Sequence, residues 1–221
     1  MTNPRVGIIG AGQLGRMMAL AGYPLCVDCH FLDTARDAPG GQVAPIRVAA
    51  LDDADALRAL AGEIDVLTFD IENVPIEVLE QVAAQVPVYP QPQVLAAAQD
   101  RLAEKRLFRE LGIPTAAFVT IDDASDLDRA AETLGWPIVL KRRRLGYDGR
   151  GQRVAEDSTT LARGWRELDE APAIAEECVN FERELSLIGV GGADGAMRFY
   201  PLSENVHRDG QLVSTLSLIH I

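Results

Sequence analysis

Up to residue 92 the chain alternates short apolar runs with amphipathic segments, and this alternation limits the folds open to it. The apolar runs predict strands at residues 6–9, 27–32 and 66–69. The segments that follow them predict helices at residues 13–21, 53–60 and 76–84. Strands joined by helices run parallel in one sheet with helices on its faces. We therefore expect an α/β domain, which the proline-rich segment 86–92 ends as a short strand and linker.

The remainder of the chain predicts an α+β arrangement, because its helices are followed by a run of strands. Helices are expected at residues 94–111, 125–134 and 161–168. Strands are expected at residues 117–121, 138–141, 174–177, 184–190 and 197–202. The glycine-rich residues 191–195 predict a hairpin turn between the last two strands.

The composition is typical of a soluble globular protein. The 221 residues are 48% hydrophobic and 24% charged, and their number allows one or two domains of about 150 residues. No run approaches the roughly 18 apolar residues of a membrane span, and the first residues lead into a strand without a signal peptide. A net charge of −12 argues against a nucleic-acid partner. We expect a cytoplasmic protein with no membrane or nucleic-acid partner.

The chain has 3 cysteines, an odd number that disfavours a disulfide framework. Cys26 and Cys29 have the CxxC spacing, but no second pair completes a zinc site. Because residues 27–32 predict a strand rather than the start of a helix, structural thiols are favoured over a redox pair.

A basic, glycine-rich segment follows the strand expected at residues 138–141. Lys141 ends that strand, and glycines further on allow backbone N–H groups to turn toward an anion. A cluster of cations on an acidic chain indicates an anionic ligand, so the segment predicts a nucleotide-phosphate site. The alternative is a solvated hairpin tip.

Residues 10–15 form a GxGxxG motif between the first strand and the first helix, and Asp33 lies at the end of the next strand. This pattern is typical of a dinucleotide site. The same glycines serve any phosphate or ribose at a helix N-terminus, so NAD remains one of several interpretations.

Five segments occur in an order that resembles one family. They are GIIGAGQLGRM at residues 7–17, FDIENVP at residues 69–75, QDR with Lys105 at residues 99–105, GYDGRGQ at residues 146–152, and FYPL with Glu204, Asn205 and His207 from residue 199. They resemble the 5-(carboxyamino)imidazole ribonucleotide synthases, which are ATP-dependent carboxylases of purine biosynthesis in the ATP-grasp superfamily. The resemblance covers residues 5 to 214.

The resemblance implies three domains. They are a preATP-grasp domain with a Rossmann-like parallel sheet at 1–92, a small lid domain with a connecting helix at 93–175, and an incomplete C-terminal ATP-grasp domain at 176–215.

The resemblance also implies an ATP site. Arg101 and Lys141 would contact the phosphates, and a flexible loop would close over them, formed by Gly146, Tyr147, Asp148, Gly149, Arg150, Gly151 and Gln152. The adenine would lie at a hinge formed by Glu176, Glu177, Cys178 and Val179. Glu184 would hold the ribose hydroxyls, and His207 would lie on the nucleotide side. An exposed strand residue for Glu184 and a surface histidine for His207 are the structural alternatives.

For the ribonucleotide, the resemblance implies a pocket of Glu72, Tyr147, Asp148 and Arg150, with Gly12, Gln13, Leu14 and Gly15 near its phosphate. Glu72 could instead be a capping partner before Pro75. The implied chemistry phosphorylates bicarbonate with ATP to carboxyphosphate, which carboxylates the exocyclic amine of aminoimidazole ribonucleotide. Asp148 is expected to orient or deprotonate that amine, and Mg²⁺ is expected to bridge the ATP phosphates.

Several expectations concern the extent of the chain. Family members continue for more than a hundred residues, and their magnesium ligands lie in that continuation, so we predict no metal ligand in this chain and an inactive chain by itself. Residues 216–221 fit no family continuation and are expected to be a non-native tail without a packing partner. The family implies a homodimer.

The sequence also departs from the family pattern in the glycine-rich segment, because Leu145 stands where a glycine is usual. Another ATP-grasp ligase, such as a formate-dependent glycinamide ribonucleotide transformylase, and an inactive nucleotide-binding fragment remain as alternatives.

Overall fold

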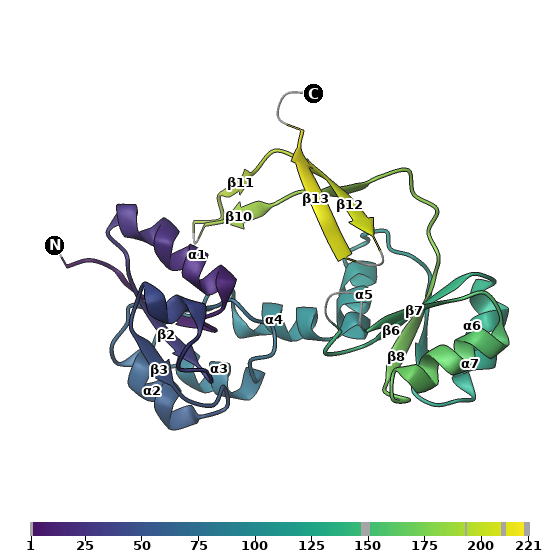
Figure 1. Ribbon diagram of the computed structural model, residues 1–221, viewed down its shortest axis with the longest axis horizontal. Helices are drawn as coiled ribbons and strands as arrows, with labels where there is room; N and C mark the ends of the chain where they lie inside the picture. Colours follow the sequence, from purple (N-terminus) through teal and green to yellow (C-terminus); the bar gives the residue numbers. More distant parts are fainter. Residues whose placement is uncertain (1, 147–150, 193, 209–210, 219–221) are drawn as a thin grey trace. The chain divides into compact units, whose positions relative to one another are not determined.

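The computed structural model describes residues 2–146, 151–192, 194–208 and 211–218 (Figure 1). The chain divides into two compact units, Met1–Leu107 and Phe108–Ile221. Each unit is described by itself.

The first unit contains the predicted parallel sheet, together with a short edge strand that the sequence did not predict. The strands β1 (Arg5–Ile9), β2 (Asp28–Asp33), β3 (Ile46–Val48) and β4 (Val66–Phe69) lie in the order β3-β2-β1-β4 and run parallel. The segment predicted as a short strand at 86–92 forms a single parallel bridge between Val88 and Leu67.

Three predicted helices accompany these strands: α1 (Gln13–Gly22) lies between β1 and β2, α2 (Ala54–Ala61) lies between β3 and β4, and α3 (Ile76–Ala83) follows β4. Two short 3-10 helices, η1 (Tyr23–Leu25) and η2 (Pro39–Gln42), were not predicted. Neighbouring residues in a strand point to opposite faces of the sheet. Ile8 and Phe31 therefore pack in the core on the side of α1, whereas Ile9 and Leu32 pack in the core with α2 and α3.

The single helix predicted at 94–111 is wrong. The structure has two helices, α4 (Pro92–Gln99) and α5 (Arg101–Glu110), with Asp100 in an extended conformation between them. The Asp100 Oδ1 atom accepts a hydrogen bond of 2.9 Å from the Leu102 N–H. Asp100 thus satisfies a backbone donor at the start of α5 while its own backbone ends α4.

The second unit begins with an antiparallel sheet in the order β5-β8-β6-β7. The strands are β5 (Phe118–Ile121), β6 (Ile138–Arg142), β7 (Gln152–Ala155) and β8 (Ala173–Glu177), and β7 was not predicted. The helices α6 (Asp126–Leu134) and α7 (Ser158–Glu167) pack side by side (Figure 1). The helix α7 starts earlier than predicted because Asp157 and Thr160 form a capping box, in which Asp157 Oδ1 accepts from the Thr160 N–H at 2.7 Å.

The strand predicted at 184–190 is wrong as one element, because the chain changes partners within it. Its first part, β9 (Glu184–Ser186), pairs with β12 (Ser203–Arg208), and its last part, β10 (Gly189–Gly191), forms the predicted hairpin with β11 (Met197–Phe199). The strand predicted at 197–202 accordingly ends at Phe199. The strands β12 and β13 (Gln211–Ser217) were not predicted.

Residues 216–218, which were expected to lack a packing partner, are paired through their backbone, although the Leu216 side chain is exposed. Leu216 pairs with Glu204 in the ladder of β12 and β13, and the Leu218 N–H donates to the Leu202 carbonyl at 2.8 Å. Residues 219–221 lie outside the described residues. Their non-native origin stays a prediction.

Candidate functional site

The sheet of β5, β6, β7 and β8 has one face covered by α6 and α7 and a second face that carries Lys141. Ile138 and Leu140 of β6 pack in the helix-covered core, and so do Ala173 and Ala175 of β8. Because side chains alternate, Lys141 and Glu176 lie on the opposite face. The Lys141 Nζ atom is 3.1 Å from Glu176 Oε2. A cation is thus fixed at the end of a buried strand, with the buried Glu176 as its partner.

Two further cations of the basic segment have acidic partners of their own. Arg142 pairs with Asp169 at 3.4 Å, and Arg143 pairs with Asp122 at 3.5 Å. Both acidic side chains are largely exposed, so these pairs contribute little to stability. The solvated interpretation of the segment therefore fits Arg142 and Arg143, whereas Lys141 retains the geometry of a ligand-binding cation.

The glycine-rich loop is described only at its two ends. A Cβ atom at Gly151 would lie 2.6 Å from the Gly146 Cα atom, so the ends of the loop meet where a side chain does not fit. Leu145 has a φ of 60°, a left-handed conformation that favours glycine. Tyr147, Asp148, Gly149 and Arg150 lie outside the described residues. Their roles stay predictions.

The predicted hinge follows β8 directly. Glu176 and Glu177 end the strand, and Cys178 and Val179 come next with exposed side chains. The Glu177 N–H donates to the Ala117 carbonyl at 2.9 Å. The predicted hinge thus leaves the sheet at the end of β8, the strand that pairs with β6. Its part in binding adenine stays a prediction.

Two predicted nucleotide-side residues contact each other. His207 Nδ1 lies 2.6 Å from Glu184 Oε2, with Glu184 on β9 and His207 on the neighbouring β12. In the described structure both side chains are therefore engaged with each other rather than isolated on the surface. Their contact with a nucleotide stays a prediction.

In the first unit, the acidic residue of the GxGxxG pattern is bonded to the turn itself. Asp33 Oδ2 accepts from the Ala11 N–H at 2.7 Å, and Asp33 Oδ1 accepts from the Ala35 N–H at 2.9 Å. In a dinucleotide site the corresponding carboxylate binds ribose hydroxyls. Here both oxygens already hold backbone donors, which disfavours the NAD interpretation.

A carboxylate that the sequence did not single out lies against the glycines of the motif. Asp70 directly follows β4, and its Oδ2 atom accepts from the Gly15 N–H at 2.7 Å. A Cβ atom at Gly10 would lie 1.7 Å from Asp70 Oδ1, and Cβ atoms at Gly15 and Gly12 would lie 2.8 and 3.6 Å from Asp70 Oδ2. We call Gly10, Gly12 and Gly15 the glycine socket, because their missing side chains leave the space that this carboxylate fills.

Burial raises the pKa of the Asp70 carboxyl, while the Gly15 N–H acts in the opposite direction and the nearby Asp33 raises it further. Asp70 Oδ1 is buried without a hydrogen-bond partner among the described residues. One backbone donor in the first turn of α1, the Gly15 N–H, is thus satisfied by a side chain of the protein. A phosphate placed there would meet the Asp70 carboxyl.

Glu72 lies in the loop between β4 and α3 with an exposed side chain. The helix α3 begins after Pro75 without a side-chain cap, so the capping interpretation of Glu72 is not supported. The Gln99 side chain holds the loop from α4, since its Nε2 atom donates to the Glu72 carbonyl at 2.6 Å and to the Val74 carbonyl at 2.7 Å.

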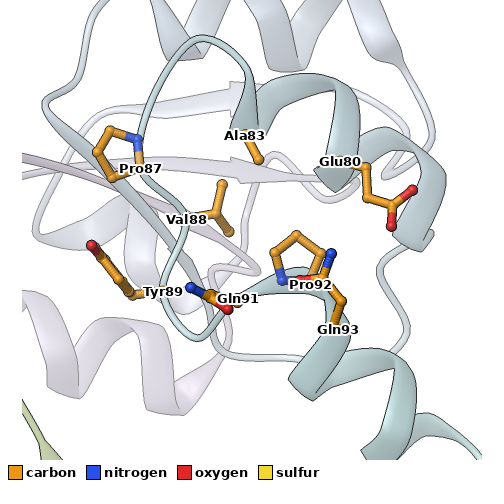
Figure 2. Close-up of a pocket in the computed structure, with 8 residues that line it drawn as sticks. All are labelled: Glu80, Ala83, Pro87, Val88, Tyr89, Gln91, Pro92 and Gln93. Carbon is orange, nitrogen blue, oxygen red and sulfur yellow. The ribbon is translucent and has the colours of Figure 1, made fainter. Parts of the chain in front are cut away.

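A cavity of about 530 Å³ lies beside the sheet in the first unit, apart from all predicted site residues. Figure 2 shows its lining from α3, from the segment after it and from the start of α4: Glu80, Ala83, Pro87, Val88, Tyr89, Gln91, Pro92 and Gln93. The lining offers a single charged side chain and no cluster of cations for a nucleotide.

The remaining expectations concern cysteines, metal and membrane. Cys26, Cys29 and Cys178 are free thiols, and burial raises the pKa of Cys29. In the ranges that the structure describes, no three His, Cys, Asp or Glu side chains are grouped as metal ligands. None of the described helices combines the length and the apolar character that crossing a membrane requires.

The two units can now be compared with known proteins. Residues 3–99 match the ribonucleotide synthetase preATP-grasp domain, and residues 106–220 match the ATP-grasp domain. The chain belongs to the ATP-grasp family. The predicted fold class, a preATP-grasp parallel sheet followed by an ATP-grasp domain with antiparallel sheets, is thereby confirmed.

This ATP-grasp chain is similar to N5-carboxyaminoimidazole ribonucleotide synthases. It is 45% identical over 208 residues to that of Pseudomonas aeruginosa, covering 94% of this chain and 58% of the relative. It is 42% identical over 213 residues to that of Brucella melitensis, covering 95% of this chain and 59% of the relative. The chain thus spans less than two thirds of the length of these relatives.

Solved structures agree with these similarities. N5-carboxyaminoimidazole synthetase from Staphylococcus aureus complexed with ADP has a TM-score of 0.94 and 33% identity, covering 99% of this ATP-grasp chain and 59% of that chain. The synthase from Aspergillus clavatus in complex with ADP and 5-aminoimidazole ribonucleotide has a TM-score of 0.87 and 29% identity, covering 96% and 56%.

Proposed function

We propose that this ATP-grasp chain forms part of an enzyme that uses ATP and bicarbonate to carboxylate the exocyclic amine of 5-aminoimidazole ribonucleotide in purine biosynthesis. The observation that carries the proposal is the 45% identity to a synthase of this kind over 94% of the chain, which includes both units. The proposal includes a cytoplasmic enzyme that forms a homodimer.

On the nucleotide side, Lys141 and Arg101 neutralise charge on the ATP phosphates, and residues 146–152 cover them. Lys141 is suited to this role because Glu176 holds its Nζ atom at a strand end on the face that α6 and α7 leave open. Charge-assisted hydrogen bonds of this kind contribute about 1.5–3 kcal/mol each. Glu176, Glu177, Cys178 and Val179 border the adenine, while Glu184 and His207 contact the nucleotide from β9 and β12.

On the ribonucleotide side, Glu72, Tyr147, Asp148 and Arg150 bind the substrate, with Gly12, Gln13, Leu14 and Gly15 nearby. The exposed Glu72 carboxylate supports this assignment, as does the hold that Gln99 has on its backbone. Because the Asp70 carboxyl fills the glycine socket, we place a hydroxyl or amine of the ligand, rather than its phosphate, closest to that turn.

The reaction proceeds in two steps. A bicarbonate oxygen attacks the γ-phosphorus of ATP, the bond to the leaving ADP breaks, and carboxyphosphate forms. The amine nitrogen then bonds to the carboxyl carbon, the bond to phosphate breaks, and Asp148 accepts the amine proton. Positioning and cationic stabilisation supply most of the rate enhancement. We expect Mg²⁺ to supply further positive charge against the ATP phosphates, and no group of three ligating side chains is found among the described residues.

A decisive experiment joins residues 1–215 to the C-terminal part of the P. aeruginosa relative and measures ADP release. The proposal expects ADP release only when aminoimidazole ribonucleotide and bicarbonate are both present. The 221-residue chain alone is expected to show no turnover. ADP release that depends instead on formate and glycinamide ribonucleotide would assign the chain to a different ATP-grasp ligase, and release that ignores the ribonucleotide would refute the proposal.

A further inference from the structure

The loop between β4 and α3 is anchored at its first residue. The Asp70 N–H donates to the Ile9 carbonyl at 2.9 Å, which continues the pairing of β4 with β1. The Asp70 side chain then accepts from the Gly15 N–H across the glycine socket. The beginning of the loop is therefore fixed to both the sheet and the first turn of α1.

The same loop is held a second time, by a side chain from α4. The Gln99 Nε2 atom lies 2.6 Å from the Glu72 carbonyl oxygen and 2.7 Å from the Val74 carbonyl oxygen. Both neighbours are acceptors, so only the NH₂ group of the amide fits this place. Gln99 is the last residue of α4, and the break at Asp100 ends the helix there.

The Glu72 side chain is exposed in the loop that these two anchors hold. Its backbone carbonyl is bound by Gln99, but within the part of the chain that the structure describes its exposed carboxylate has no hydrogen bond or ion pair. A fixed backbone that presents an unengaged carboxylate is the arrangement expected of a ligand-binding residue, because less freedom is lost on binding.

We propose that Gln99 is a positioning residue for the ribonucleotide: its amide fixes the backbone at Glu72 and Val74 so that the Glu72 carboxylate meets a hydroxyl or amine of the substrate. This inference rests on the proposed function and adds Gln99 to the residues that serve it. In this role Gln99 acts through the backbone of the loop.

The test measures binding of aminoimidazole ribonucleotide and, separately, of ATP by calorimetry to residues 1–215 joined to the C-terminal part of the P. aeruginosa relative. Gln99→Met keeps the length of the side chain and removes both donors. Gln93→Met is the matched control, because Gln93 lies exposed on the same helix and makes no hydrogen bond recorded in the described structure. Gln99→Glu keeps the shape but places a carboxylate against two carbonyl oxygens, and its protonated form regains one donor.

We expect Gln99→Met to weaken ribonucleotide binding about tenfold while ATP binding stays within twofold, and Gln93→Met to change neither. Gln99→Glu should bind the ribonucleotide poorly at pH 8 and recover part of the affinity near pH 5, because protonation of the new carboxylate returns one donor to the backbone carbonyls. NMR spectra of each variant monitor whether the first unit is folded.

Equal ribonucleotide affinity in Gln99→Met and the unsubstituted chain would overturn the inference and leave the proposed function standing. A parallel loss of ATP and ribonucleotide binding without recovery of Gln99→Glu at low pH would also overturn it. If the unsubstituted chain binds ATP but not the ribonucleotide, the substrate assignment of the loop fails and the inference fails with it.

Discussion

Replacing Gly10 by alanine tests whether the glycine socket exists to hold the Asp70 carboxyl. Gly10 has a φ of 94°, and a Cβ atom there would lie 1.7 Å from Asp70 Oδ1. The left-handed conformation alone costs roughly 1–2 kcal/mol for a residue with a side chain. The overlap also forces the carboxylate away from the Gly15 N–H, and a hydrogen bond to a charged group contributes about 1.5–3 kcal/mol. We therefore expect Gly10→Ala to lower the free energy of unfolding of the first unit by roughly 3–5 kcal/mol.

Two other glycines separate these contributions. Gly112→Ala introduces strain alone, because Gly112 has a φ of 69° and a Cβ atom there meets nothing within 4 Å, so a loss of roughly 1–2 kcal/mol is expected. Gly62→Ala introduces neither effect, since Gly62 has a φ of −71° and its nearest neighbours would lie at 3.5 and 3.9 Å. It should be neutral or stabilise by about 0.4–1 kcal/mol.

Urea unfolding can be assigned to the units because Trp136 and Trp165 both belong to the second one. Tryptophan fluorescence reports on that unit, and hydrogen exchange of the Ile8 and Phe31 amides reports on the first. With a slope of about 1–3 kcal/mol per molar urea, Gly10→Ala should lower the midpoint of the first unit by roughly 2 M and leave the fluorescence transition in place. A loss in Gly10→Ala no larger than that in Gly112→Ala would refute the socket.

Three further outcomes are expected. In the enzyme completed with the P. aeruginosa segment, Lys141→Ala should lower kcat/KM for ATP at least tenfold, and it should also lower Tm because it leaves the buried Glu176 carboxylate without its cation. Arg142→Ala, which removes the exposed pair with Asp169, should change kcat/KM by less than about twofold and leave Tm nearly unchanged. A lowered Tm with normal kinetics in Lys141→Ala would make Lys141 structural. Leu145→Gly should stabilise the second unit by roughly 0.5–1 kcal/mol in urea unfolding. The substitution relieves the strain of a left-handed leucine, and the greater flexibility of the unfolded chain offsets part of that gain. A destabilised variant would show that Leu145 is not strained. Burial raises the pKa of Asp70 in the folded state. The unfolding free energy of the parent should therefore fall relative to that of Asp70→Asn as pH rises from about 4 through this folded-state pKa. A parent that instead gains stability relative to Asp70→Asn as pH rises would show that the pKa is shifted in the opposite direction.

Local sequence patterns predicted most of the helices and strands. They failed where contacts between residues distant in the sequence determine where an element begins or ends. The strands that end at Ile9 and Phe69 follow from apolar runs, and α2 lies where an amphipathic segment predicted it, although the capping role of Asp53 was not predicted. The break at Asp100 was missed because helix-forming residues continue on both sides of a single extended residue. The change of partners after Ser186 depends on pairing with β12, which no local signal reveals.

The candidate site shows the same division. Lys141 at a strand end could be predicted from sequence, because an apolar run followed by a lysine and glycines is local information. Asp70 could not, since its contact with Gly15 joins residues 55 positions apart. The partners of Arg142 and Arg143 are likewise distant acids, so the sequence alone overcounted the cations available to a phosphate.

The strand β6 places a packing residue and a residue proposed to bind ATP side by side in the sequence, with Leu140 in the helix-covered core and Lys141 on the other face. Substitutions on the two faces are therefore separable, and the binding face can be varied without disturbing the core. Insertion or deletion of one residue is different, because it exchanges the faces of every residue beyond it. A single deletion before Leu140 would direct the lysine into the core and the leucine toward the ligand. This strand should accordingly accept many replacements during laboratory evolution and no change in its length.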